Sequence, residues 1–136
     1  MPNWCENKVE VYGEIHDIIE WKAFVKSDTC EFDFNKILPM PKELEDTVKG
    51  SAHVPSEKLI EKYGADNWYD WRIFNWGTKW DVDDVQIEEE TDYMHYSFDT
   101  AWSPPDGIHS KLKEKFPDLS ITWFWKEPGV QEAGYL

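Results

Sequence analysis

Cysteine is scarce in this sequence, because the 136 residues include only Cys5 and Cys30. The two cysteines do not form a CxxC pair, and no cysteine–histidine cluster has the spacing of a zinc site. We therefore expect no disulfide framework, no bound metal and no cofactor.

Long apolar runs are also absent. No stretch approaches the ~20 apolar residues that a membrane-spanning helix needs. The N-terminal segment MPNWCENK lacks the apolar region of a signal peptide. We expect a cytoplasmic protein with no membrane partner and with both thiols reduced.

Positively charged residues are few: the sequence has 14 Lys and Arg and 28 Asp and Glu, so the net charge is −14. Such a surface repels a phosphate backbone, so direct nucleic-acid binding is not expected. The same field would attract a basic protein partner. A local basic pocket would still admit a small anion, and acidity that only favours solubility is a further interpretation.

Common catalytic motifs are missing: the sequence has no GxSxG, P-loop, HExxH or GxGxxG. Asp81, Asp83 and Asp84 lie close together, but their spacing matches no known metal-binding loop, so a solvated strand entry is favoured. Cys5 has no identifiable histidine partner and is interpreted as a buried structural residue. His109, like the other scattered histidines, is expected to be exposed.

The hydrophobic pattern predicts the order strand, helix, insertion, strand, strand, helix, strand. Apolar and polar residues alternate in four segments, around Val9 and Val11 and over 85–87, 94–102 and 119–125. Helical spacing is found in two segments, about 16–27 and 108–116. This is the βαββαβ pattern of an α+β, ferredoxin-like fold, with a four-stranded antiparallel sheet and two helices on one face. Residues 1–136 would form one domain with 31–76 as an insertion.

Several local features are also predicted. Phe32 and Phe34 alternate with acidic residues, which suggests a short edge strand. Within the insertion, two helices are expected, over 55–63 and 66–74. Ser103 is expected to cap the last helix. The tail after residue 126 is left open between a short edge strand and a mobile segment.

The segment 67–80, NWYDWRIFNWGTKW, has an unusual concentration of tryptophan and carries two of the 14 basic residues. Trp80 would open the second strand and Trp102 would close the third, so a hairpin would bring them together. The candidate ligand-binding residues are Trp68, Trp71, Arg72, Trp76, Lys79, Trp80, Thr100, Trp102 and Ser103. Rings, cations and hydroxyls suit a planar anionic ligand such as a nucleotide. The alternative is a tryptophan-rich core that holds the insertion against the sheet, with Arg72 paired to a carboxylate.

Several segments together resemble the YubB-like family of phages, plasmids and their bacterial hosts. They are MPNWCENKVEVYG, ILPMPKEL, YGADNWYDWRIFNWGTKWDV, FDTAWSPP and FPDLSITWFWKEPG, and they span most of the chain. The resemblance implies a ferredoxin-like domain and a mobile-element setting, in a family without an established activity. It implies no iron–sulfur cluster, since two cysteines cannot supply the usual four ligands.

Three functions follow as hypotheses, the first being the leading one. The protein is a noncatalytic binder of a small anionic or nucleotide-like molecule, which in a mobile element would serve to sequester a host immune signal. Alternatively, it is an acidic interaction protein that inhibits a nucleic-acid-binding host protein. The third hypothesis is an enzyme acting on a small phosphorylated or nucleobase substrate.

The geometry of the tryptophan-rich segment distinguishes these hypotheses. The first and third predict a concave pocket lined by Trp68, Trp80 and Trp102, with Arg72 or Lys79 pointing inward. The second predicts that these residues are packed shut and that carboxylates line one face of the molecule. An enzyme would also need an acid or base within reach of the ligand. The oligomeric state is not predicted.

Overall fold

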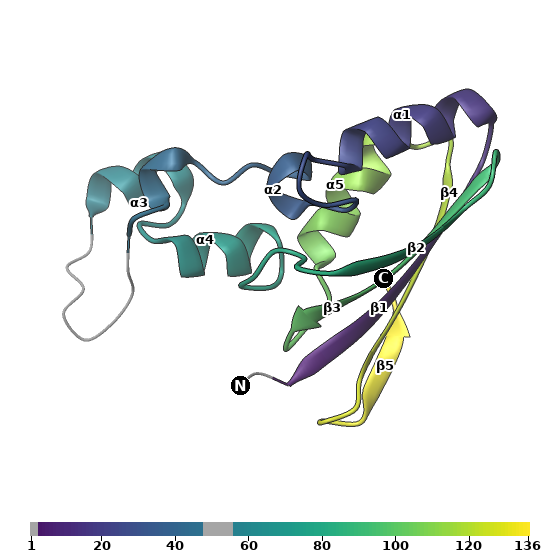
Figure 1. The fold of residues 1–136 in the computed structure, drawn as a ribbon. Coiled ribbons are helices and arrows are strands. Elements are labelled where there is room, and N and C mark those ends of the chain that lie inside the picture. Colours follow the sequence, from purple (N-terminus) through teal and green to yellow (C-terminus); the bar gives the residue numbers. More distant parts are fainter. Residues whose placement is uncertain (1–2, 48–55) are drawn as a thin grey trace.

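A five-stranded antiparallel sheet, in the order β2-β3-β1-β4-β5, forms the centre of the computed structural model, which describes residues 3–47 and 56–136 (Figure 1). Its strands are β1 (Trp4–Tyr12), β2 (Val85–Glu89), β3 (Tyr93–Ala101), β4 (Ser120–Glu127) and β5 (Glu132–Tyr135). The central strand β1 pairs with β3 on one side and with β4 on the other. The predicted ferredoxin-like fold is confirmed, and the tail adds β5 as a fifth strand at the edge beside β4.

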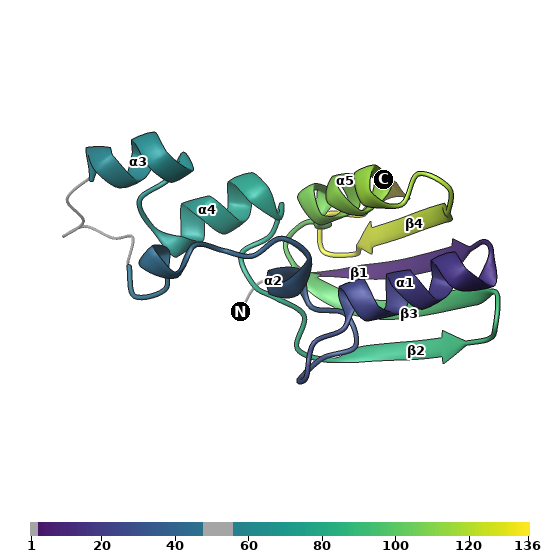
Figure 2. The ribbon, with the colours of Figure 1, turned by 90° about the horizontal axis from the view of Figure 1, so that it is seen from above.

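Two helices, α1 (Ile15–Val25) and α5 (Asp106–Lys115), cover one face of this sheet (Figure 2). Between α1 and β2 the chain forms α2 (Phe34–Ile37), the 3-10 turn η1 (Lys42–Leu44), α3 (Glu57–Tyr63) and α4 (Trp68–Asn75). Of these, α3 and α4 extend beyond the end of the sheet. The interpretation of residues 31–76 as an insertion within one domain stays a prediction.

The two predicted helices of this segment are present with shifted starts. The Ser56 side chain accepts a hydrogen bond from the Leu59 amide and caps α3, while residue 55 lies outside the described residues. Asn67 caps α4 by accepting from the Asp70 amide at 2.8 Å. Side-chain caps of this kind satisfy amides that have no partner within the helix.

Strict alternation along β1 gives the sheet two different faces. Cys5, Asn7, Val9 and Val11 are buried on the side of the helices. The intervening residues point to the other side, which no helix covers in the part of the chain that the structure describes. We call this side the open face. A half-buried strand produces this pattern because successive side chains point in opposite directions.

Large rings fill the space between the sheet and the helices. Trp21 from α1 packs against Phe32 and Tyr96, and Trp123 from β4 also contacts Phe32. The buried indole of Trp21 donates to the Tyr96 hydroxyl at 3.1 Å, and that of Trp123 donates to Asn7 Oδ1 at 3.0 Å. The core is therefore aromatic, and the indole N–H groups that it buries have acceptors.

The predicted edge strand at Phe32 and Phe34 is wrong. Both side chains are fully buried, and helix α2 begins at Phe34. Asp33 caps this short helix by accepting from the Lys36 amide at 3.2 Å. Alternation over three residues does not distinguish a strand from a capped turn that buries both rings.

The predicted N-cap at Ser103 is also wrong, because α5 begins at Asp106. The Ser103 hydroxyl instead donates to the Gly77 carbonyl at 2.6 Å. The Gly107 amide donates to the Trp76 carbonyl at 3.1 Å. These bonds join the start of α5 to the end of α4. Because the Ser103 hydroxyl is bonded to Gly77, it does not cap the helix.

No helix within 3–47 and 56–136 has the length and apolar character needed to cross a membrane. Both cysteines are free thiols. Cys5 is fully buried in β1, as expected for a structural residue.

Candidate functional site

Four of the predicted site residues form a packed cluster on and beside α4 rather than an open pocket. The Arg72 guanidinium lies between two rings, 5.1 Å from the centroid of Trp68 and 4.8 Å from that of Trp76. Trp71 and Trp76 are 5% and 0% exposed and meet edge to face. We call Trp68, Trp71, Arg72 and Trp76 the packed cluster.

The guanidinium group of Arg72 makes its contacts within the protein. Its Nη1 donates to the Lys79 carbonyl at 3.2 Å, and its Nε is buried without a partner among the described residues. Burial lowers the pKa of Arg72 from its usual value. No carboxylate forms an ion pair with it within the described ranges, so the predicted partner is replaced by a carbonyl and two rings.

The remaining predicted residues lie elsewhere. Trp102 has a positive φ of 71° and is 53% exposed, and it follows β3 instead of closing it. Trp80 precedes β2 instead of opening it. The Thr100 hydroxyl donates to the Ser103 carbonyl at 2.7 Å. Of the nine predicted residues, Trp80 and Thr100 line the cavity described next, with Lys79 beside Trp80.

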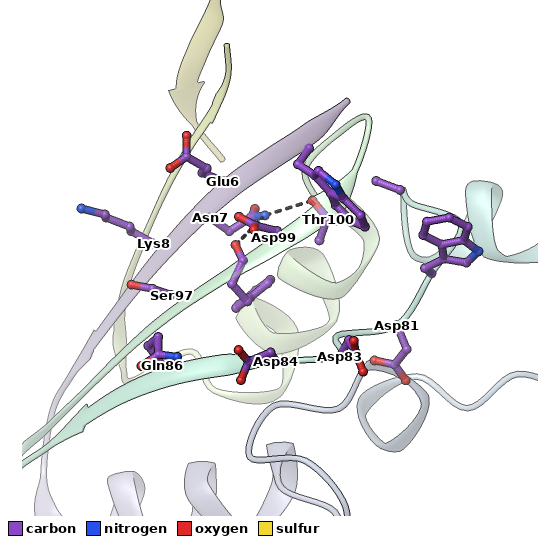
Figure 3. Close-up of a pocket in the computed structure, with 14 residues that line it drawn as sticks. Glu6, Asn7, Lys8, Asp81, Asp83, Asp84, Gln86, Ser97, Asp99 and Thr100 are labelled. Atoms are coloured by element: carbon purple, nitrogen blue, oxygen red, sulfur yellow. Dashed lines mark hydrogen bonds between the residues drawn. The ribbon is translucent and has the colours of Figure 1, made fainter. Parts of the chain in front are cut away.

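A cavity of about 710 Å³ lies at one end of the sheet, where the segment 80–84 approaches β1 and β3 (Figure 3). Carboxylates from three parts of the chain line it, namely Glu6 of β1, Asp99 of β3, and Asp81, Asp83 and Asp84 of the segment before β2. Lys8 is the one cationic side chain among the lining residues. We call this the acidic cavity.

Strand pairing creates the crowding of negative charge. Glu6 and Asp99 occupy directly opposite positions of β1 and β3, where like charges destabilise a sheet. Burial, together with the Glu6 carboxylate, raises the pKa of Asp99. Glu6 also lies 3.7 Å from Lys126, which offsets part of its charge. Repulsion between Glu6 and Asp99 therefore destabilises the folded protein, and a bound cation would reduce this repulsion.

Asp81 holds one wall of the acidic cavity in place. Its Oδ1 accepts from the amides of Phe34 and Val82, each at 2.7 Å, and its Oδ2 accepts from the Asn35 amide at 3.0 Å. Burial, followed by the adjacent Asp33 carboxylate, raises the pKa of Asp81 to about 6. Asp81 is thus an anchor between the segment 80–84 and α2, because its oxygens are occupied by amides.

An aromatic pair also lines the acidic cavity. The rings of Trp4 and Trp80 lie 5.9 Å apart at an angle of 42°. They are 41% and 39% exposed, whereas the core rings of Trp21, Trp76 and Trp123 are fully buried. The Lys79 ammonium lies 4.3 Å from the centroid of the Trp80 ring.

A second aromatic group occupies the far end of the open face. Tyr12 and Tyr93 occupy opposite positions on β1 and β3, and the Tyr12 hydroxyl is 2.8 Å from His95 Nε2. Glu88 lies 3.6 Å from the other ring nitrogen of His95. The open face therefore carries rings at both ends and carboxylates between them.

Two further features bear on the chemistry available near the acidic cavity. Among the described residues, no group of three or more His, Cys, Asp and Glu has the arrangement of a metal site. Burial raises the pKa of the Cys5 thiol to about 11, so it is not a ready nucleophile. The acidic cavity is a concave surface lined by aromatic rings and carboxylates.

Trp4, Glu6 and Asp99 line the acidic cavity but were not among the site residues predicted from the sequence. A signal was present, because the alternation WCENKVEVY extends back to Trp4 and places it on the same face as Glu6 and Lys8. The pairing that brings Asp99 opposite Glu6 has no such local signal.

Comparison with known proteins agrees with the fold. Residues 75–136 match the model of a family described as the ferredoxin-like domain in Api92-like protein. The resemblance noted in the sequence was to a YubB-like family, and a ferredoxin-like domain is common to the two descriptions.

A solved structure is similar along almost the whole chain. It is the crystal structure of a protein api92 from Yersinia pseudotuberculosis, with a TM-score of 0.64 and 10% sequence identity, and the similarity covers 99% of this chain and 93% of that one. At this identity, the likeness establishes a shared fold. No curated protein sequence matches the chain.

Proposed function

We propose that this protein is a noncatalytic interaction protein that binds a basic protein partner through its open face. The observation that carries the proposal is the acidic cavity, where five carboxylates and one ammonium group surround about 710 Å³. This is the second of the three functional hypotheses. In the mobile-element setting that the resemblance implies, a basic nucleic-acid-binding protein of the host is the expected target.

The free carboxylates give the proposal its physical basis. Asp83, Asp84 and Asp99 line the cavity and form no ion pair with the described residues. A basic partner would supply the missing charge, and the net charge of −14 would steer it toward the protein. Because such attraction is screened by salt, binding should weaken as ionic strength rises.

The small-anion hypothesis has less support from this geometry. The cation that it relies on, Arg72, lies in the packed cluster and donates to a backbone carbonyl. The carboxylates of the acidic cavity would repel phosphate. Binding of a nucleotide stays a prediction, and a thermal-shift screen would test it. Sequestration of an immune signal and an enzymatic reaction depend on such binding and stay predictions too.

The proposal is tested by measuring the affinity for an oligo-lysine peptide by calorimetry at low and physiological salt. In one double variant, Glu6→Gln and Asp99→Asn remove two charges from the open face. In the matched control, Glu20→Gln and Glu114→Gln remove two exposed charges from α1 and α5, on the opposite side of the sheet. We expect the first variant to bind about tenfold more weakly, and the control to bind nearly as well as wild type.

Two results would contradict the proposal. Equal weakening in both double variants would mean that the peptide responds to overall charge rather than to this face. Absence of salt-sensitive binding in the wild-type protein would remove the interaction altogether.

A further inference from the structure

We propose that the acidic cavity receives an arginine side chain of the partner, with its guanidinium group stacked on the Trp4–Trp80 pair and hydrogen-bonded to carboxylates of the cavity. This inference rests on the proposed function and names the residue type that the site selects. Its basis is the presence of an exposed aromatic pair and unpaired carboxylates around the same cavity.

The aromatic pair is arranged to receive a flat, positively charged group. Trp4 lies at the start of β1 and Trp80 lies just before β2, so two distant segments bring the rings to 5.9 Å. Both rings keep about two-fifths of their surface exposed. Tryptophan faces attract cations more strongly than other aromatic faces do.

The chain itself shows that this ring attracts a cation. The Lys79 ammonium lies 4.3 Å from the Trp80 centroid, although no carboxylate forms an ion pair with Lys79 among the described residues. Lys79 is half-buried, and its ammonium group lies over the ring of the next residue in the chain. We infer that the face of Trp80 favours positive charge. An incoming guanidinium group would bind beside the Lys79 ammonium or replace it.

The surrounding carboxylates favour arginine over lysine. A guanidinium group is planar and presents five N–H donors, so it can stack on a ring and bond to a carboxylate at the same time. Asp83, Asp84 and Asp99 have no ion pair in the described part of the chain, whereas Glu6 lies 3.7 Å from Lys126 and Asp81 accepts from three amides. An ammonium group offers a point charge without a flat surface, and it would satisfy fewer of these contacts.

The size of the cavity suits a side chain together with part of its backbone. A volume of about 710 Å³ is within the range of small-molecule pockets, roughly 300–1,000 Å³, and is larger than one side chain requires. A segment of the partner, rather than a free amino acid, would fill it. Gln86 and Ser97, paired on β2 and β3, extend the lining with neutral polar groups.

Other occupants are less compatible with the charges. A second copy of this chain would bring another −14 against the same acidic surface. A nucleic acid would find rings at both ends of the open face, but its phosphates would meet the carboxylates between them.

The test compares oligo-arginine and oligo-lysine peptides of equal length, using calorimetry and tryptophan fluorescence. Wild-type protein should bind the arginine peptide roughly tenfold more tightly. Trp4→Leu and Trp80→Leu should each remove most of this preference, because they weaken binding of the arginine peptide more than binding of the lysine peptide. Trp102→Leu is the matched control, because Trp102 is an exposed tryptophan that does not line the cavity, and it should keep the preference.

The outcomes separate the two proposals. Equal binding of both peptides by wild-type protein, or loss of the preference in Trp102→Leu, would overturn the arginine site while leaving the proposed function in place. Failure of both peptides to bind would overturn both. Tight binding of a single-stranded oligonucleotide at the same tryptophans would also overturn both. If a leucine variant does not fold, Trp4→Phe and Trp80→Phe retain a ring and should retain part of the preference.

Discussion

Replacing Arg72 by alanine should destabilise the protein without affecting the acidic cavity. In the native structure the guanidinium lies against the rings of Trp68 and Trp76 and donates to the Lys79 carbonyl. Alanine removes all three contacts and leaves the carbonyl without this donor. The packed cluster would lose the group that fills the space between its rings.

The size of the effect follows from these contacts. A hydrogen bond from a charged donor contributes about 1.5–3 kcal/mol. Each partly exposed cation–π contact contributes about 0.5–1 kcal/mol. Removal of the unpartnered Nε and the higher helix propensity of alanine offset part of the loss. We therefore expect a net loss of about 2 kcal/mol, or a fall of roughly 6–10 °C in Tm for a domain of this length.

The assay is thermal unfolding of wild type, Arg72→Ala and Arg72→Met, with and without a set of nucleotides. Methionine keeps an unbranched stem between the rings, so its Tm should lie between the other two. Lys79→Ala, which removes a half-buried side chain and its ring contact but keeps the backbone carbonyl that Arg72 bonds, is the control and should lower Tm less than Arg72→Ala. An unchanged Tm in Arg72→Ala, combined with a nucleotide-induced shift that is present only in wild type, would refute the packed cluster and support an anion site.

Three further predictions concern the rest of the chain. Because the pKa of Asp81 rises from 3.8 to about 6 in the folded protein, its contribution to stability is present below pH ~4 and is lost as the pH rises through ~6. Asp81→Asn removes this titration, so it should flatten the fall in urea midpoint between pH 4 and pH 7.5, and an unchanged fall would contradict this. Gly107→Ala should lower Tm despite its better helix propensity, because the added Cβ would overlap the Asn75 carbonyl oxygen of the preceding helix; a stabilised variant would show that this contact is loose. Cys5, which is fully buried, should react with a thiol reagent only after denaturation, whereas half-buried Cys30 should react slowly in the folded protein because burial raises its pKa; rapid labelling of Cys5 in the folded protein would contradict its placement.

The fold was predictable because three of its strands, β1, β3 and β4, are half-buried. Alternation around Val9, through Tyr96 and through Trp123 fixes which side chains face the helices, and the order of elements leaves few topologies. The end of β3 was not predictable in this way. Trp102 continues the alternation in sequence, but its positive φ turns the chain after Ala101.

The candidate site was less accessible to sequence reasoning, because it depends on long-range contacts. The clustering of Glu6 with Asp99 requires the register between β1 and β3. The position of Asp81 requires amides from α2, which lies far away in the sequence. The concentration of tryptophan and basic residues in 67–80 predicted a binding site there, but Trp71 and Trp76 are buried and the Arg72 guanidinium is held between two rings. His109, expected to be exposed, instead lies partly buried against Trp123.

The most direct test of binding at the open face is an NMR titration of the isotope-labelled protein with an oligo-arginine peptide. Amide shifts should concentrate on β1, β3 and the segment 80–84, and the indole signals of Trp4 and Trp80 should move with them. Amides of α1 and α5, on the other side of the sheet, should change little. Shifts centred on those helices or on α3 and α4, or spread evenly over the acidic surface, would contradict binding at the open face.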